Sequence, residues 1–372
     1  MRVIVIGAGP AGLATAASLG QFGIAATVLD AGFAVGDSWR GHYDRLVLHT
    51  ARGKSGLPGL PMPRGFGRYP TRAQVVDYLH DYAAHFGITP QFATRVSAVR
   101  HTDAGWQVTH DGGTETGDAV VFATGMNAVP YRANVSGADS FPGPVLHSSD
   151  YANPEPFTGQ RVLVVGFGNS GGDIALDLAD AGVTTDIAVR SPVNLLPKEL
   201  FGIPITSFGI VRRVLPYKWA EALMTPILRL KLGDYARYGL RKAAKGPISQ
   251  IIEDGRIPLI DVGTLAAIRA GRITVRRGPD RIDGARVTFD DGQVAGYDAI
   301  VLATGYRVDL CPLLGDLPGV LENGRPVVSG GRTTAQGLYF CSYVASADGQ
   351  LARIGVEAQA IAADIALLQR GI

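Results

Sequence analysis

Two short apolar runs in this chain are each followed at once by a glycine-rich turn and then by an alanine- or leucine-rich helical pattern. The runs occupy residues 3–6 and 162–165 and consist only of valine, isoleucine and leucine. Unbroken runs of this kind are typical of strands that are buried in a parallel sheet. The order of strand, tight turn and helix therefore predicts an α/β fold at both places.

The two turns share one glycine spacing. In such a turn the first glycine permits the tight bend, the second lets the backbone approach a pyrophosphate, and the third packs the helix on the strand. One copy also arises by chance as a plain turn, but two copies in this context favour two dinucleotide sites. The candidate cofactor-binding residues are Gly7, Gly9 and Gly12 in the first turn, and Gly166, Gly168, Asn169, Ser170 and Gly171 in the second.

The residue that follows the next strand differs between the two units. Asp30 stands 23 positions after Gly7, where a carboxylate can bind both ribose hydroxyls of an adenosine and should repel a 2′-phosphate. Arg190, followed by Ser191, stands 24 positions after Gly166, and its guanidinium suits a phosphate. We therefore expect FAD, or NAD, at the first site and NADPH at the second. An exposed strand-end acid and a solvated surface cation are the alternatives.

Two further apolar strands end in the same tripeptide, Ala-Thr-Gly. They place Thr124 and Gly125 after the first strand and Thr304 and Gly305 after the second, where small residues let the backbone pass close to a neighbour or a cofactor. Alternating sequences with Asp-Gly turns at 111–112 and 291–292 predict antiparallel meanders before both. We expect two Rossmann-like dinucleotide-binding domains, the second inserted into the first: residues 1–153 and 298–372 for FAD, and 154–297 for NADPH.

The composition is that of an enzyme rather than of a nucleic-acid-binding protein. The 372 residues are 46% hydrophobic, enough for two or three domains with sizeable cores, and a net charge of +2 gives no concentrated basic face. Cys311 and Cys341 form no CxxC pair and no metal-ligand cluster, so we predict neither a metal site nor a disulfide framework. No signal peptide precedes the first strand and no apolar run reaches the length of a membrane span, so we expect a cytoplasmic protein.

The segment before the second glycine-rich turn resembles a family signature. Residues 141–151 match the FxGxxxHxxxY/F pattern of flavin-containing monooxygenases at Phe141, Gly143, His147 and Tyr151. Within that family the chain is similar to the plant YUCCA flavin monooxygenases over nearly its whole length. The segments that carry this similarity are SWR at 38–40, YDRL at 43–46, LPGLPMP at 57–63, YPT at 69–71, VRS at 189–191, LPKE at 196–199 and residues 265–271.

The resemblance implies a class B flavoprotein monooxygenase that holds FAD and NADPH. NADPH would pass hydride to FAD, the reduced flavin would take up O2 as a C4a-(hydro)peroxyflavin, and one oxygen atom would go to a small lipophilic substrate. It also implies that Trp39, Arg40 and His49 lie against the flavin. The helix that opens at Gln350 and Leu351 either points at the flavin or only packs.

The catalytic candidate is Asn127, which follows the first Ala-Thr-Gly strand. The resemblance places it as a neutral donor near the nicotinamide and the reacting oxygen, and a plain turn asparagine is the alternative. For the substrate, the resemblance favours oxidative decarboxylation of an aryl 2-oxo acid such as indole-3-pyruvate. N- or S-oxygenation of an amine or sulfide, and uncoupled NADPH oxidase activity, are the alternatives.

Residues 201–245 combine apolar with basic side chains, among them Arg212 and Arg213. Their apolar side could roof a substrate tunnel, form a homodimer contact, or lie on a membrane surface, because basic amphipathic helices bind anionic lipid. A plain insertion, packed on its own domain with a solvated basic face, is the fourth interpretation.

Overall fold

The computed structural model describes residues 1–210 and 215–371. The chain folds into two compact units. Unit 1 comprises Met1–Arg40, Thr50–Val129 and Tyr306–Ile372, and unit 2 comprises Gly41–His49 and Pro130–Gly305. The chain passes between the units at the short strands β7 (Val129–Pro130) and β20 (Tyr306–Arg307). The expected domain limits, 1–153, 154–297 and 298–372, stay a prediction.

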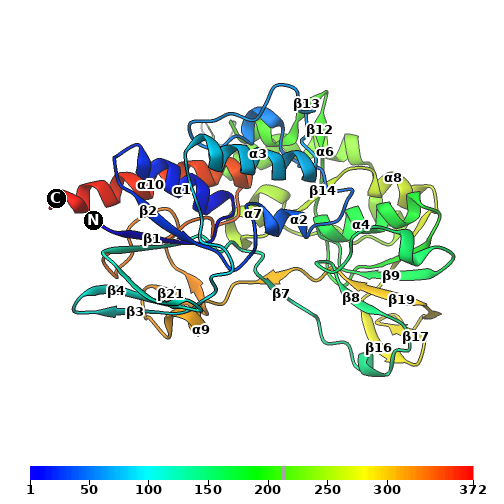
Figure 1. The fold of residues 1–372 in the computed structure, drawn as a ribbon. Helices are drawn as coiled ribbons and strands as arrows, with labels where there is room; N and C mark the ends of the chain where they lie inside the picture. The colour runs from blue at the N-terminus through cyan, green and yellow to red at the C-terminus, as the bar shows by residue number, and fades with distance from the viewer. Residues whose placement is uncertain (211–214, 372) are drawn as a thin grey trace. The chain divides into compact units, whose positions relative to one another are not determined.

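Unit 1 is built on a parallel four-stranded sheet of order β2-β1-β6-β23. Its strands are β1 (Val3–Ile6), β2 (Ala26–Leu29), β6 (Ala119–Phe122) and β23 (Leu338–Phe340). Helix α1 (Pro10–Gly20) packs along α10 (Gln350–Gln369), as the blue and red helices of Figure 1 show. β1 is fully buried, which explains why it consists of apolar residues alone.

The remaining elements of unit 1 surround this sheet. Helix α3 (Arg72–His85) begins at a capping box, in which Thr71 and Gln74 bind each other's backbone N–H groups. An antiparallel meander packs on the sheet through a buried cluster that includes Val108 and Phe122. The strands of this meander are β3 (Val96–Thr102), β4 (Gly105–His110) and β5 (Gly113–Gly117). The other elements of unit 1 are α2 (Asp37–Arg40), η1 (Arg52–Lys54), α9 (Cys311–Leu314), β21 (Leu321–Glu322) and β22 (Arg325–Pro326).

Unit 2 contains a parallel five-stranded sheet of order β15-β10-β9-β19-β8. Its strands are β8 (Val145–His147), β9 (Arg161–Val165), β10 (Thr184–Ala188), β15 (Ile273–Arg276) and β19 (Ala299–Leu302). Side chains of β9 alternate between two buried clusters. Val162 and Val164 meet helices α4 (Asn169–Asp180) and α8 (Thr264–Arg269), whereas Leu163 and Val165 face the opposite side.

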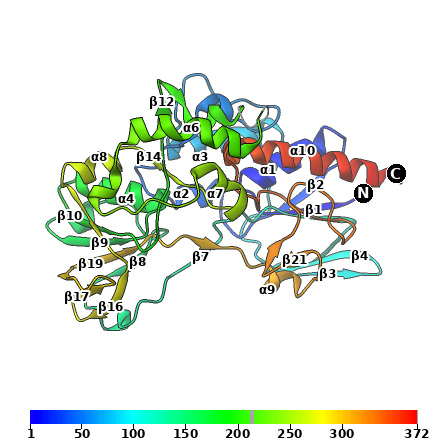
Figure 2. The ribbon, with the colours of Figure 1, turned by 180° about the vertical axis from the view of Figure 1, so that it is seen from behind.

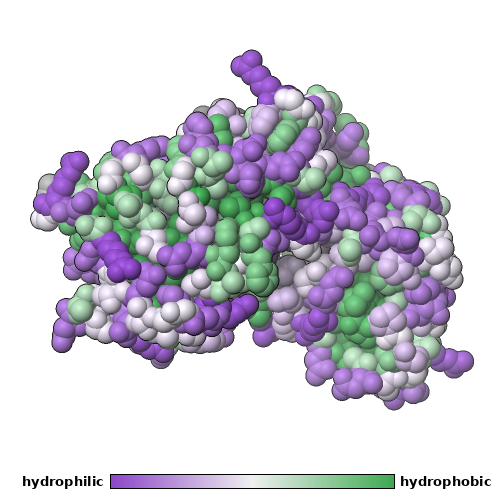
Figure 3. All heavy atoms as spheres, viewed as in Figure 1, coloured by the Kyte–Doolittle hydropathy of each residue, from purple (hydrophilic) through white to green (hydrophobic). Residues whose placement is uncertain are grey.

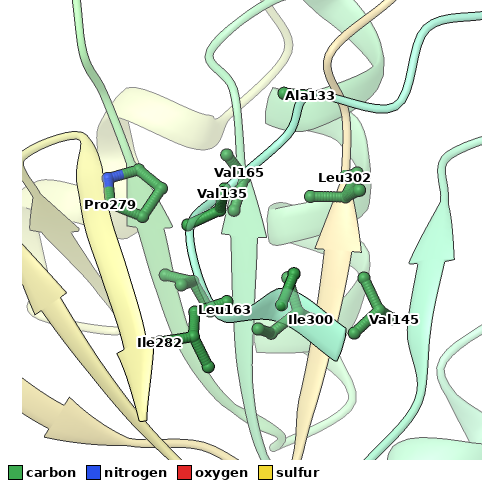
Figure 4. Close-up of a pocket in the computed structure, with 10 residues that line it drawn as sticks. Ala133, Val135, Val145, Leu163, Val165, Pro279, Ile282, Ile300 and Leu302 are labelled. Atoms are coloured by element: carbon green, nitrogen blue, oxygen red, sulfur yellow. The ribbon is translucent and has the colours of Figure 1, made fainter. Parts of the chain in front are cut away.

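That opposite face of the sheet is covered by a second antiparallel meander, which Figure 2 shows beside β19. It consists of β16 (Pro279–Asp283), β17 (Arg286–Phe289) and β18 (Val294–Gly296). Between the meander and the sheet lies a small cavity with only apolar lining, drawn in Figure 4. Because no predicted site residue lines it, this cavity is a packing space of the core and not the predicted site.

The other elements of unit 2 lie between β10 and β15 in the chain or before β9. They are η2 (Ala138–Ser140), η3 (Glu155–Phe157), β11 (Leu195–Pro197), β12 (Glu199–Leu200), β13 (Ile203–Pro204), η4 (Ile205–Ile210), α6 (Tyr217–Leu232), η5 (Tyr235–Tyr238), α7 (Pro247–Asp254) and β14 (Leu259–Asp261). The described parts of segment 201–245, residues 201–210 and 215–245, form a hairpin end, 3₁₀ turns and one long helix. Arg212 and Arg213 lie outside the described residues.

The structure confirms the local predictions. Both apolar runs are parallel strands, both glycine-rich turns lead into helices, and both Asp-Gly pairs join strands of a meander. The fold is mixed α/β with two nucleotide-binding-type sheets. On the face viewed in Figure 3, hydrophilic residues in purple intersperse with smaller hydrophobic areas in green, as on an ordinary protein surface.

Candidate functional site

Close backbone neighbours leave no room for a side chain at two of the three glycines of the first turn. Gly7 has a φ of 109°, and a Cβ added there would lie 2.6 Å from the carbonyl oxygen of Ala123. A Cβ at Gly12 would lie 1.7 Å from the carbonyl oxygen of Gly7. By contrast, a Cβ at Gly9 would meet no atom within 4 Å. The protein itself therefore requires Gly7 and Gly12, whereas Gly9 faces open space.

The second turn repeats this arrangement. A Cβ at Gly166 would lie 2.4 Å from the carbonyl oxygen of Ala303, and one at Gly171 would lie 2.2 Å from that of Gly166. A Cβ at Gly168 would again meet nothing within 4 Å. Since Ala123 and Ala303 each begin an Ala-Thr-Gly tripeptide, both strands ending in that tripeptide pass directly beside a glycine-rich turn.

The open glycines sit at the start of helices. Gly9 is the N-cap of α1 and Gly168 is the N-cap of α4, and neither helix has a side-chain cap. The first backbone N–H groups of such a helix, together with its dipole, favour an anion. The open space at Gly9 and Gly168 thus fits a pyrophosphate at each turn. Of the other predicted residues there, Ser170 is half-buried, and the Oδ1 atom of Asn169 accepts from Ile260 N at 2.7 Å.

The two strand-end residues differ in charge and in contacts. Asp30 follows β2 directly, and its carboxylate accepts from Ala8 N at 2.5 Å and from Gly32 N at 2.7 Å. These bonds fasten the acid to the first turn and leave lone pairs for further donors. Arg190 lies two residues beyond the end of β10 and is exposed, as is Ser191. Among the described residues, the Arg190 guanidinium has no polar partner.

The threonines of the two Ala-Thr-Gly tripeptides bind within their own units. The Thr124 hydroxyl lies 2.6 Å from that of Tyr343, and the Thr304 hydroxyl donates to the carbonyl of Tyr131. Gly125 and Gly305 both have positive φ, 80° and 83°, so the backbone turns there. These contacts set the path of the chain beside each glycine-rich turn.

The family signature has a structural role in unit 2. Phe141 belongs to the cluster under the meander, and a Cβ at Gly143 would lie 2.0 Å from the carbonyl oxygen of Asp298. His147 is fully buried, with Nε2 2.9 Å from the Gly305 carbonyl oxygen and Nδ1 accepting from Ser149 N at 3.1 Å. Burial lowers the pKa of His147, so the ring is neutral at pH 7 and its Nε2–H donates to Gly305.

Sequence reasoning missed a carboxylate on α4. Asp173 is 6% exposed and accepts from the Tyr43 hydroxyl at 2.8 Å, while His49 Nε2 lies 3.5 Å away. One and two turns further along the helix, Asp177 and Asp180 both pair with Arg45. The spacing of the three aspartates on one helix face was the available signal. Segment Gly41–His49 is thereby fastened to unit 2.

The residues expected near the flavin fall into both units. Trp39 and Arg40 end α2 of unit 1, where the Arg40 guanidinium donates to Val35 O at 2.6 Å and to Asp37 Oδ1 at 3.1 Å. His49, in contrast, belongs to unit 2. Asn127 is exposed in a turn just before β7.

At the start of α10, the side chain of Leu351 is buried and the amide of Gln350 is bound locally. Its Nε2 atom donates to Ser342 Oγ at 2.9 Å. Its Oε1 atom is buried and has no partner among the described residues, so this acceptor remains available to a donor. The helix begins at Gln350, as predicted.

Other kinds of site find no support in the residues that the structure describes. In residues 1–210 and 215–371, no group of three or more His, Cys, Asp or Glu side chains could hold a metal ion. Over the same residues, no helix is both long and apolar enough to cross a bilayer.

Comparison with known proteins identifies the family of this chain. Residues 4–196 match the model of the family described as pyridine nucleotide-disulphide oxidoreductase. The chain is 39% identical to indole-3-pyruvate monooxygenase YUCCA1 of Oryza sativa subsp. japonica over 84% of this chain and 78% of that protein. It is likewise 39% identical to indole-3-pyruvate monooxygenase YUCCA6 of Arabidopsis thaliana, over 82% of this chain and 75% of that protein.

A solved structure agrees with these relatives. A mutant flavin monooxygenase from Stenotrophomonas maltophilia superposes with a TM-score of 0.76 at 25% identity, covering 99% of this chain and 98% of that one. Flavin monooxygenases of this type use FAD and NADPH, and the open glycines and helix starts of both turns fit two such dinucleotides. The chain therefore belongs to the flavin-containing monooxygenase family, in the group of the YUCCA flavin monooxygenases.

Proposed function

We propose that this flavin-dependent monooxygenase binds FAD in unit 1 and NADPH in unit 2, and that it oxidatively decarboxylates an aryl 2-oxo acid such as indole-3-pyruvate. We further propose that the NADPH domain is inserted into the FAD domain. When bound, FAD reduced by NADPH supplies the chemistry that activates O2. The protein supplies binding, orientation and exclusion of water.

The observation that carries the cofactor assignment is the contrast between Asp30 and Arg190. Ile6, just before the first turn, pairs with Leu29, so Asp30 stands one residue beyond the pair. Val165, just before the second turn, pairs with Ala188, so Arg190 stands two residues beyond the pair. An acid and a guanidinium thus occupy nearly equivalent places. The acid suits an unphosphorylated adenosine ribose, as in FAD, and the guanidinium suits the 2′-phosphate of NADPH.

The residues of each turn would share the binding of its dinucleotide. In unit 1 we assign the pyrophosphate to the first turn of α1, and the flavin to the neighbourhood of Trp39, Arg40, Thr124, Gly125 and the α10 start at Gln350 and Leu351. In unit 2 we assign the pyrophosphate to the turn 166–171 with Thr304 and Gly305 beside it. His49 and Asn127 stay candidates for contact with the reacting groups, Asn127 as a neutral donor.

The substrate class rests on the relatives. Proteins at 39% identity over more than four fifths of the chain carry the name indole-3-pyruvate monooxygenase. This supports a 2-oxo acid substrate. Oxygenation of an amine or sulfide, and uncoupled NADPH oxidation, are the competing outcomes of the test.

Disulfide reduction, suggested by the name of the matching family model, has little support in this chain. The chain contains only Cys311 and Cys341, both free. Burial raises the pKa of the Cys341 thiol to about 12, so it is not a thiolate at neutral pH. A redox-active cysteine needs a lowered thiol pKa, whereas burial raises that of Cys341.

The test is aerobic turnover of the flavin-loaded enzyme with NADPH. Indole-3-pyruvate, phenylpyruvate and a simple sulfide are offered in parallel, while NADPH consumption, hydrogen peroxide and the oxygenated product are measured. We expect NADPH consumption coupled to release of carbon dioxide with the 2-oxo acids. Sulfoxide formation without decarboxylation would assign heteroatom oxygenation instead. Peroxide alone with every substrate would make the protein an oxidase.

A further inference from the structure

Helix α6 carries an apolar stripe on each of two nearly opposite faces. The inner stripe is Ala220, Met224, Leu228 and Leu232, which repeat every four residues and are buried in unit 2. The outer stripe, as we call it, is Trp219, Leu223 and Leu230, which are 71%, 59% and 85% exposed. At 100° per residue the centres of the two stripes lie about 140° apart around the helix. Figure 2 shows α6 beside α7.

This outer stripe departs from the usual pattern of a surface helix. A helix that packs on a core through one stripe normally presents charged and polar residues on the opposite face. Here a tryptophan and two leucines take those positions, with Pro226 between them. Scattered exposed apolar residues need no explanation, but a row of large ones on one helix face indicates a binding surface.

The charge beside the outer stripe is positive. Lys218 and Arg229 lie exposed on the side of the helix between the two stripes, and neither forms an ion pair within the described part of the chain. Segment 217–245 as a whole contains seven lysines and arginines against two carboxylates. Of these carboxylates, Glu221 accepts from Ile248 N and Ser249 N at the start of α7, and Asp234 pairs with Lys242. Neither acid therefore pairs with Lys218 or Arg229.

We propose that the outer stripe of α6 binds the surface of an anionic lipid bilayer. The two leucines and the indole would enter the interfacial layer, where tryptophan is favoured, and Lys218 and Arg229 would meet lipid phosphates. A second copy of this chain fits less well. In a two-fold dimer through the same face, the cations of one copy would lie against those of the other. Charge complementarity therefore selects the lipid.

The test uses the full chain loaded with FAD and vesicles of two compositions. We expect co-sedimentation with vesicles containing phosphatidylglycerol, little with pure phosphatidylcholine, and weakening as salt is raised. Of the three tryptophans, Trp106 is buried, Trp39 is half-buried in unit 1, and Trp219 is 71% exposed, so we expect Trp219 to report lipid contact. Its emission should shift to the blue on binding. Trp219→Phe should abolish most of that shift while largely keeping the binding.

Paired variants separate the stripe from its charges. Leu223→Gln with Leu230→Gln should weaken binding to anionic vesicles by about tenfold or more, because two buried apolar contacts are lost. Lys218→Glu with Arg229→Glu should remove the preference for anionic vesicles. Val356→Gln on α10, where the valine is 63% exposed, is the matched control and should bind as the unchanged chain does. Flavin content and thermal melting establish that each variant is folded.

Three outcomes would overturn the proposal. The first is no binding, or equal binding to both kinds of vesicle. The second is a dimer in sedimentation velocity that Leu223→Gln with Leu230→Gln dissociates, without any vesicle binding, because a second copy would then cover the stripe. The third is an equal loss of binding in Val356→Gln.

Discussion

Replacing Arg190 by alanine should change the choice of nicotinamide coenzyme more than the rate of the reaction. The guanidinium is exposed at the end of β10 and has no polar partner among the described residues, so its removal leaves no buried group unpaired. Its stem lies along Gly278, where a Cβ would be 3.0 Å from the Arg190 Cγ. The folded state should therefore be little affected, and the effect should appear in the binding of the 2′-phosphate.

The expected magnitude follows from the kind of contact. A hydrogen bond to a charged group is worth about 1.5–3 kcal/mol, and an exposed site belongs at the lower end because water competes. A loss of about 1.5 kcal/mol raises the KM for NADPH roughly tenfold relative to that for NADH. Arg190→Lys keeps the charge but loses the fork of donors, so we expect an intermediate value.

Steady-state kinetics with both coenzymes measures this ratio. Arg281→Ala, which removes another exposed arginine of unit 2, is the matched control and should leave the ratio unchanged. An equal rise of KM for NADPH and NADH in Arg190→Ala would refute the assignment of the second site to a phosphorylated ribose. So would no change for either coenzyme.

Three further substitutions test the site. Gly9→Ala should fold normally, because its Cβ meets no protein atom, but it should lose flavin absorbance, because the methyl group enters the space that fits the pyrophosphate. Gly12→Ala should melt at a lower temperature even without flavin, because its Cβ would lie 1.7 Å from a carbonyl oxygen. Equal melting temperatures of the two apoproteins would contradict this. His147 has a lowered pKa when folded, so the stability it contributes is present above about pH 6.5 and lost as the pH falls below that. His147→Gln should flatten this part of the melting-temperature profile, and an unchanged slope would exclude His147 as its source. Tyr43→Phe leaves Asp173 without its 2.8 Å donor and should destabilise unit 2 by about 1–3 kcal/mol, and an unshifted melting curve would argue against it.

The parts of the fold that could be predicted from the sequence are those with local signals. The apolar runs and the glycine spacing of both turns lie within a dozen residues, so the strand, turn and helix could be placed together. The Asp-Gly pairs likewise marked the hairpins of both meanders. The contrast of Asp30 with Arg190 was readable because each residue lies at a set distance from its turn.

What could not be predicted depends on contacts between distant parts of the chain. Tyr43 and Asp173 are 130 positions apart, and nothing in the pattern around Tyr43 assigns it to unit 2. The hydrogen bond from His147 to Gly305 spans 158 positions, so the signature histidine could be recognised as a family feature without its role. The sequence shows the apolar residues of α6, but it does not show which of them pack into the core of unit 2 and which stay exposed.

The division of unit 1 among separated stretches of the chain has a consequence for synthesis on the ribosome. Strand β23 completes its sheet and α10 packs along α1, yet both are translated after the whole of unit 2. The nascent N-terminal segment must therefore wait, with β6 paired to β1 but not yet to β23 and with α1 not yet covered by α10, while unit 2 can already fold. We expect a chain released before β23 and α10 are made to have a folded unit 2, while the N-terminal part of unit 1 stays exposed to proteases and chaperones.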